Sequence, residues 1–148
     1  MSNVQLHHVG LLMPTEEAAQ QFMKLIGLEE ERRGYVPEYQ ALCIFAKGNG
    51  ASPVELVIPQ GGKLGEYKGG KPVLHHLAFA VEDIRAVQAE YAAKAMPLLD
   101  EQPVQGAGDF VVNFLKPRHT GGILVEFVQN TRPGVPPVVP HREPEPGA

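Results

Sequence analysis

The chain has one cysteine, no long apolar run and no excess of positive charge. Cys43 has no second cysteine to pair with, so an internal disulfide is excluded. Its place in the apolar stretch 41–45 predicts a small buried core residue. No segment approaches the roughly 18 to 20 apolar residues that cross a bilayer, and segment 1–6 is polar, without the apolar core of a signal peptide. We therefore expect a cytoplasmic protein with no membrane partner.

The charge balance and the distribution of proline bear on the binding partners and on the domain organisation. Lys and Arg number 13 against 17 Asp and Glu, and no basic stripe stands out, which argues against a nucleic-acid partner. A hydrophobic content of 43% over 148 residues is typical of a globular domain. Six of the 14 prolines follow residue 130. We therefore expect one domain over 1–130 and a proline-rich, disordered tail over 131–148.

A double histidine introduces each half of an internal repeat. Segment 6–13 (LHHVGLLM) recurs as segment 74–81 (LHHLAFAV), and segment 54–57 (VELV) corresponds to segment 125–128 (VEFV). Internal repeats determine architecture, so we treat the chain as two modules of the same kind. Module one covers about 4–60, a glycine-rich linker covers 61–71, and module two covers about 72–130.

Each module has the same pattern of expected elements. The double-histidine strand is followed by an acidic start and apolar residues at helical spacing, at Thr15 to Ile26 and at Glu82 to Ala95. Three short strand patterns then follow in each half, at 28–33, 39–46 and 54–58 and at 98–101, 110–115 and 123–128. The pattern predicts the α+β fold class with two tandem βαβββ modules, and if these join into one curved sheet they share a concave cleft.

Strand alternation selects which polar residues face that cleft. Successive side chains point to opposite faces, so adjacent histidines cannot both enter one site. His76 shares its face with small residues, whereas its neighbour His75 shares one with large apolar residues that suit a core. The same test places His8 on the open face of the first strand.

Applied to the last strand of each module, the alternation test places Glu55 and Glu126 on the open side. It also places Ile123, Val125 and Phe127 in the core. Two imidazoles and two carboxylates at equivalent positions of a repeat are typical ligands of a divalent transition metal.

Several segments together resemble the vicinal oxygen chelate superfamily (the glyoxalase and bleomycin-resistance group), and within it the methylmalonyl-CoA epimerase family. The resemblance covers about residues 5–129. The segments that carry it are HHVG at 7–10, VELVIP at 54–59, LHHLAFAVEDI at 74–84, DEQP at 100–103, GAG at 106–108, FLKP at 114–117 and TGGILVE at 120–126. It implies that the two tandem βαβββ modules form a curved, mostly antiparallel sheet around a metal-binding cleft. It also implies His8, Glu55, His76 and Glu126 as metal ligands, and Glu38 with Glu126 as a pair of catalytic glutamates. Glu38 also shares the parity of Leu42 and Ile44, which we assign to the cleft side.

The resemblance predicts a metal-dependent epimerase or racemase that removes and returns the acidic α proton of a carboxylic acid or acyl-CoA through a metal-stabilised enolate. The expected cofactor is a divalent ion, among cobalt, nickel, manganese, zinc and magnesium, and the expected assembly is a homodimer. These epimerases typically have His-Pro-Lys where this chain has Lys116, Pro117 and Arg118. A glyoxalase-type isomerase like lactoylglutathione lyase, or an epimerase of a non-CoA carboxylate, is therefore an alternative. A resistance-type protein that sequesters a small ligand is the non-enzyme alternative.

Overall fold

A computed structural model describes residues 4–48 and 53–131. The first half contains the strands β1 (Gln5–Leu12), β2 (Glu29–Val36), β3 (Ala41–Lys47) and β4 (Val54–Pro59), with the helix α1 (Glu16–Ile26) and the short 3-10 turn η1 (Pro37–Tyr39). The second half contains β5 (Val73–Ala80), β6 (Val104–Gln105), β7 (Phe110–Leu115) and β8 (Val125–Asn130), with α3 (Ile84–Ala93) and η3 (Pro117–His119). Between them lie α2 (Gly62–Glu66) and η2 (Tyr67–Gly70).

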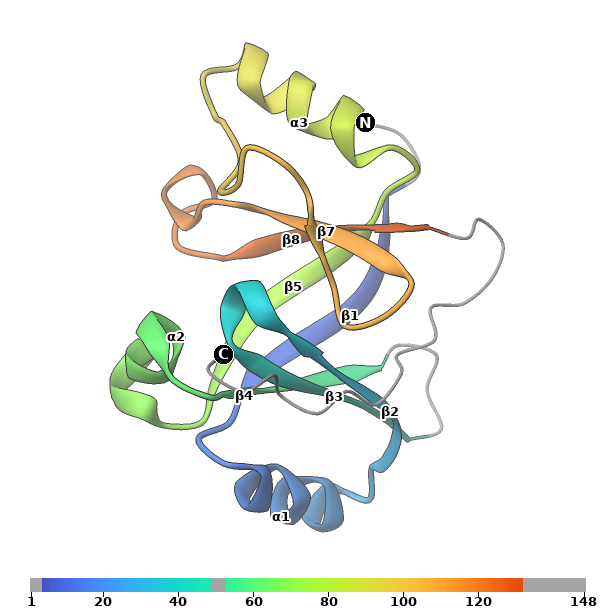
Figure 1. Ribbon diagram of the computed structural model, residues 1–148, viewed down its shortest axis with the longest axis vertical. Coiled ribbons are helices and arrows are strands. Elements are labelled where there is room, and N and C mark those ends of the chain that lie inside the picture. The colour runs from blue at the N-terminus through green and yellow to red at the C-terminus, as the bar shows by residue number, and fades with distance from the viewer. Residues whose placement is uncertain (1–3, 49–52, 132–148) are drawn as a thin grey trace.

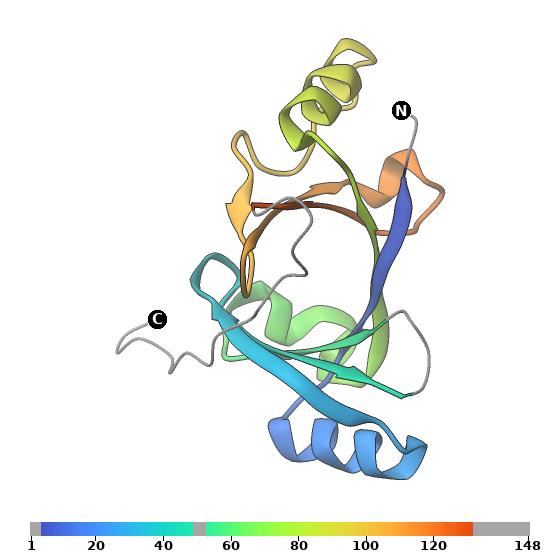
Figure 2. The same ribbon diagram turned by 90° about the vertical axis from the view of Figure 1, so that its right-hand side faces the viewer.

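The strands form one eight-stranded sheet in the order β2-β3-β4-β1-β5-β8-β7-β6. The two double-histidine strands, β1 and β5, pair antiparallel at its centre, and each pairs in parallel with the last strand of its own module. The remaining pairs are antiparallel. The sheet curls into a half-barrel with α1 and α3 outside it (Figures 1 and 2). The predicted fold of two βαβββ modules in a curved, mostly antiparallel sheet is confirmed.

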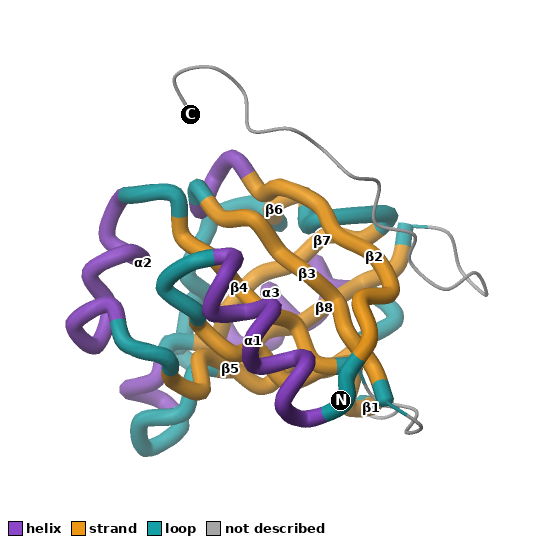
Figure 3. The backbone as a smooth tube through the Cα atoms, turned by 90° about the horizontal axis from the view of Figure 1, so that it is seen from below, coloured by secondary structure: helices purple, strands orange, loops and turns teal. Residues whose placement is uncertain are grey.

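Local signals explain where the two long helices begin. The Thr15 side chain accepts a hydrogen bond from the backbone N–H of Ala18, 3.0 Å away, and caps α1. Asp83 caps α3 in the same way, accepting from the N–H groups of Arg85 and Ala86. Each helix therefore starts where its module turns back over the sheet, and α1 lies across the outer face (Figure 3).

Apolar side chains fill both sides of the sheet. One cluster packs under α1, around Met23, Ile44 and Leu56, and another packs under α3, around Ile84 and Phe127. A third cluster on the concave side draws on both modules, and its members include Cys43, Phe45, Val57, Phe110 and Val112. The prediction that Cys43 is buried is confirmed.

Three expectations about secondary structure and burial differ from the structure. Segment 98–101 is loop, and the strand β6 follows it. The Asn113 side chain bonds to both backbone groups of Asp100, and the Leu99 N–H donates to the Phe114 carbonyl of β7, so side-chain bonds replace a regular ladder. The linker 61–71 holds the helical turns α2 and η2. Ile123 is 52% exposed rather than in the core, because it lies before β8 begins.

The predicted disordered tail over 131–148 falls, apart from Thr131, outside the described residues. No helix in the described ranges is both long and apolar enough to span a membrane.

Candidate functional site

The two histidines assigned to the open face lie on the central strand pair. His8 on β1 is fully buried, and His76 on β5 is 5% exposed. His76 lies directly opposite Gly10 in the β1–β5 ladder. A β-carbon at Gly10 would come within 2.6 Å of three atoms of the His76 ring, so the imidazole occupies the space that the glycine leaves free.

The two carboxylates come from the strands that flank this pair. Glu55 on β4 lies beside Gly10 in the parallel ladder of β1 and β4. Glu126 on β8 lies beside Ala78 in the parallel ladder of β5 and β8. Each module therefore contributes one histidine and one glutamate, and the pairing of β1 with β5 joins the two half-sets.

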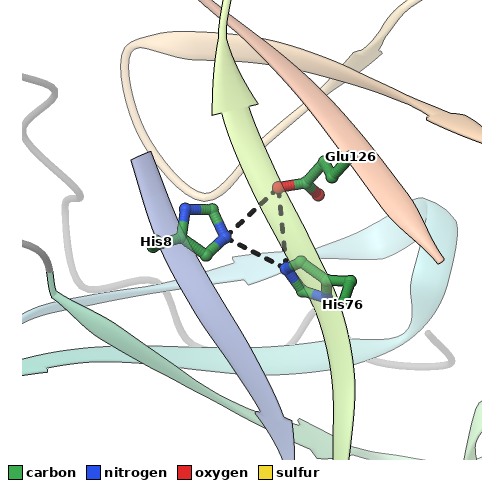
Figure 4. A group of neighbouring side chains, drawn as sticks. All are labelled: His8, His76 and Glu126. Atoms are coloured by element: carbon green, nitrogen blue, oxygen red, sulfur yellow. Dashed lines mark hydrogen bonds and ion pairs between the residues drawn. The ribbon is translucent and has the colours of Figure 1, made fainter. Parts of the chain in front are cut away.

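The four side chains meet at the centre of the sheet. The Nε2 atoms of His8 and His76 are 3.0 Å apart. Glu126 Oε1 lies 3.2 Å from the first of these atoms and 3.7 Å from the second (Figure 4). Glu55 Oε1 lies 3.5 Å from His8 Nε2 and 3.2 Å from His76 Nε2.

The donor spacing suits a divalent cation. With metal–ligand bonds of about 2.1 Å, neighbouring ligands lie about 3.0 Å apart at right angles and about 3.4 Å apart in a tetrahedron. The observed separations of 3.0 to 3.7 Å fall around these values. The buried Glu126 Oε1 has no hydrogen-bond partner among the described residues. His8, His76 and Glu126 could therefore hold an ion. Glu55 Oε1, which lies 3.2 to 3.5 Å from the two Nε2 atoms, could join them as a fourth ligand.

The electrostatics of the cluster reflect two buried carboxylates between two imidazoles. Burial alone would lower the pKa of His8, but the carboxylates of Glu55 and Glu126 raise it to about 10. Burial alone would raise the pKa of Glu55, but the imidazoles of His8 and His76 hold it well below its ordinary value. In the absence of a cation, a proton on His8 therefore offsets part of the buried negative charge, and a divalent cation would replace it.

A cavity of about 530 Å³ opens beside the cluster. Glu55, His76 and Glu126 line it, together with largely apolar side chains of both modules, whereas His8 lies behind it. Glu38 lines the same cavity.

The parity argument that placed Glu38 on the cleft side was wrong. Leu42 and Ile44, whose parity it shares, pack under α1 on the outer face. Glu38 lies on η1, and the left-handed conformation of Gln40 (φ 49°) breaks the alternation between η1 and β3. It reaches the cavity because η1 lies at the cavity wall.

Strand alternation also misjudged the outer histidine of each pair. The Nδ1 atom of His7 lies 2.7 Å from Nδ1 of His8, and His75 has the same contact with His76. Burial and the positive charge of the adjacent imidazole lower the pKa of both outer histidines to about 4. The double histidine in both repeats was the signal for this arrangement.

A contact between modules was also missed. The Tyr39 hydroxyl, beside Glu38, donates to Asp100 Oδ2 at 3.0 Å. Burial and the Asp100 carboxylate raise the pKa of Tyr39 well above its ordinary value. The adjacent residue Leu99 lines the cavity, so this hydrogen bond fixes two of its walls to each other.

Comparison with known proteins gives consistent matches. The family model described as the glyoxalase/bleomycin resistance protein/dioxygenase superfamily matches residues 7–114. The mitochondrial methylmalonyl-CoA epimerase of Homo sapiens is 31% identical over 132 residues, which cover 84% of this chain and 73% of that protein. The ethylmalonyl-CoA/methylmalonyl-CoA epimerase of Cereibacter sphaeroides is 30% identical over 131 residues, covering 84% and 97%.

Solved structures show the same fold. A variant of the Streptomyces coelicolor methylmalonyl-CoA epimerase, in complex with 2-nitronate-propionyl-CoA, superposes with a TM-score of 0.79 and is 25% identical. The match covers 89% of this chain and 98% of that one. The resemblance to this family seen in the sequence is therefore confirmed.

Proposed function

The chain belongs to the glyoxalase/bleomycin resistance protein/dioxygenase superfamily, and on that premise we propose that it is a metal-dependent epimerase of the methylmalonyl-CoA epimerase type. The substrate would be a carboxylic acid or acyl-CoA with an acidic α proton. The observation that carries the proposal is that two histidines and two glutamates converge beside a cavity whose wall also carries Glu38. Curated relatives of about 30% identity are named as epimerases of malonyl-CoA derivatives, which supports the same chemistry.

The four converging side chains are the proposed ligands of a divalent ion. His8 and His76 would present Nε2, and Glu55 and Glu126 would present Oε1. Such an ion acts as a Lewis acid toward carbonyl and carboxylate oxygens and lowers the cost of removing the neighbouring α proton. The apolar cavity walls exclude water from the reacting carbon, which strengthens each electrostatic interaction in the site.

Two glutamates are the proposed acid–base pair. Epimerisation needs one group that removes the proton from one face of the α carbon and another that returns a proton to the opposite face. Glu126 lies on β8 and Glu38 on η1, and both residues line the cavity. The homodimer and the cytoplasmic location remain predictions.

Proton exchange in D2O tests this assignment. The wild type, loaded with a divalent ion, should interconvert the epimers of methylmalonyl-CoA and introduce deuterium at the α position. Glu38→Gln should lower kcat for epimerisation by about 10²- to 10⁴-fold with metal content unchanged. It should still exchange the α proton of the one epimer that presents this proton to Glu126. Glu17→Gln, at an exposed position on α1, is the matched control.

Full epimerisation by Glu38→Gln would contradict the two-base assignment. A wild type that ignores acyl-CoA esters but acts on glutathione adducts or free polycarboxylates would favour the glyoxalase-type or non-CoA alternative. Tight binding of a small ligand without turnover and without metal would favour the sequestering protein.

A further inference from the structure

Two irregularities in the central strand pair occur at equivalent histidines. In the β1–β5 ladder, Leu6 and His8 face consecutive residues of β5, which leaves His7 as an extra residue. His75 is the extra residue of β5, between Leu74 and His76. A β-bulge of this kind bends the strand and redirects a side chain, which explains why adjacent imidazoles meet here.

Each redirected imidazole contacts the rear nitrogen of a proposed ligand. His7 and His8 approach with their Nδ1 atoms 2.7 Å apart, and so do His75 and His76. The ring centroids are 5.0 Å apart in both pairs, in edge-on geometry. The Nε2 atoms of the two inner histidines face each other and the carboxylates instead. The same arrangement therefore occurs once in each module.

The 2.7 Å contact places one proton between two nitrogens. A neutral imidazole carries its proton on one nitrogen and a lone pair on the other. If Nε2 of His8 presents its lone pair to a cation, Nδ1 of His8 must carry the proton, and Nδ1 of His7 must accept it. His7 is then the tautomer protonated on Nε2. The same argument places the proton on Nδ1 of His76 and on Nε2 of His75.

Aromatic neighbours hold the outer rings in place. The His7 ring lies 6.1 Å from the ring of Phe110, and the His75 ring lies 5.6 Å from that of Tyr67 in edge-on geometry. A metal-binding histidine usually donates its rear N–H to a carboxylate, a backbone carbonyl or water. Here the acceptor is a neutral imidazole, which adds no negative charge beside the two buried carboxylates of the cluster.

We propose that His7 and His75 are positioning residues that hold His8 and His76 in the Nδ1–H tautomer, with Nε2 aimed at the metal. The assignment rests on the proposed metal site. It concerns residues that strand alternation excludes from that site and that enter it only through the bulges.

Metal affinity measured with Co²⁺ alone tests the proposal without an activity assay. Competition with a chromophoric chelator should show His7→Phe and His75→Phe binding Co²⁺ about 10- to 100-fold more weakly than the wild type. The visible spectrum of bound Co²⁺ should change in both variants. His7→Asn should recover most of the affinity, because an amide oxygen can accept the Nδ1–H. His119→Phe, at a histidine on η3, controls for loss of a histidine elsewhere.

A measurement on the unsubstituted protein covers the case in which a variant fails to fold. Long-range ¹⁵N–¹H NMR of the Zn²⁺-loaded wild type should show protons on Nδ1 of His8 and His76 and on Nε2 of His7 and His75. The reverse pattern would overturn the proposal, as would wild-type affinity in both phenylalanine variants. Equal weakening by His7→Asn and His7→Phe would also overturn it, because that indicates packing alone. A wild type that binds no Co²⁺ or Zn²⁺ would overturn the metal site and this proposal together.

Discussion

Replacing Gly10 with alanine should displace one proposed metal ligand while leaving the donor set chemically intact. A β-carbon at this position would lie 2.2, 2.4 and 2.6 Å from Cε1, Nδ1 and Nε2 of His76. Carbon contacts are ordinarily about 3.5 to 4.0 Å, so the imidazole must retreat by about 1 Å or more. Functional constellations tolerate errors of about 0.5 Å. We expect Co²⁺ to bind Gly10→Ala at least about tenfold more weakly, a loss of about 1.4 kcal/mol or more.

The assay for Gly10→Ala compares metal affinity with stability, because overpacking alone costs about 1 to 3 kcal/mol. Ala19→Val is a matched control, because it overpacks a fully buried position in the cluster under α1, which includes no proposed ligand. Both variants should unfold at lower urea concentrations than the wild type. Only Gly10→Ala should lose Co²⁺ affinity in the chelator competition. Wild-type affinity in Gly10→Ala, or equal losses in both variants, would refute the reasoning.

Two further predictions concern buried groups outside the metal cluster. Asn113→Ala should lower the free energy of unfolding by about 2 to 3 kcal/mol in urea titrations, because it leaves both backbone groups of Asp100 without their buried partner. A change below about 0.5 kcal/mol would contradict this prediction. Burial and the nearby Glu55 and Glu126 carboxylates raise the pKa of the Cys43 thiol well above its ordinary value, so at pH 8 a disulfide reagent should modify the folded protein at least about tenfold more slowly than the urea-unfolded chain. Equal modification rates in the folded and unfolded chains would contradict the burial. The pKa of this thiol is higher in the folded than in the unfolded chain, so its contribution to stability is complete below about pH 8.5 and declines as the pH rises above it.

The repeat of the double-histidine strand was sufficient to predict two βαβββ modules, and the resemblance to the vicinal oxygen chelate superfamily supplied the curved sheet that joins them. Strand alternation also selected His8, Glu55, His76 and Glu126, whose side chains converge in the structure. The approach of Glu55 to His8 and of Glu126 to His76 follows from parallel pairing within each module, and the antiparallel pairing of β1 with β5 joins the two half-sets.

The remaining features depend on departures from regular strand geometry. His7 and His75 reach the cluster through register shifts that period-two reasoning does not represent. Glu38 reaches the cavity across a left-handed residue that reverses the parity of the strand after it. The segment 98–101 has apolar residues typical of a strand, but the Asn113 side chain bonds both backbone groups of Asp100. Each of these depends on tertiary contacts that local patterns do not record.

The division of the donor set between the modules also bears on the order of folding. The donors occupy positions 8, 55, 76 and 126, so no short stretch of the chain can assemble more than one of them. Each module can close its own parallel pair early, but the set is complete only when β1 docks on β5, after a long loop has closed. At the proposed metal site, tight capture of a cation is therefore expected late in folding, and a chain that stops at one finished module carries only half of the proposed ligands.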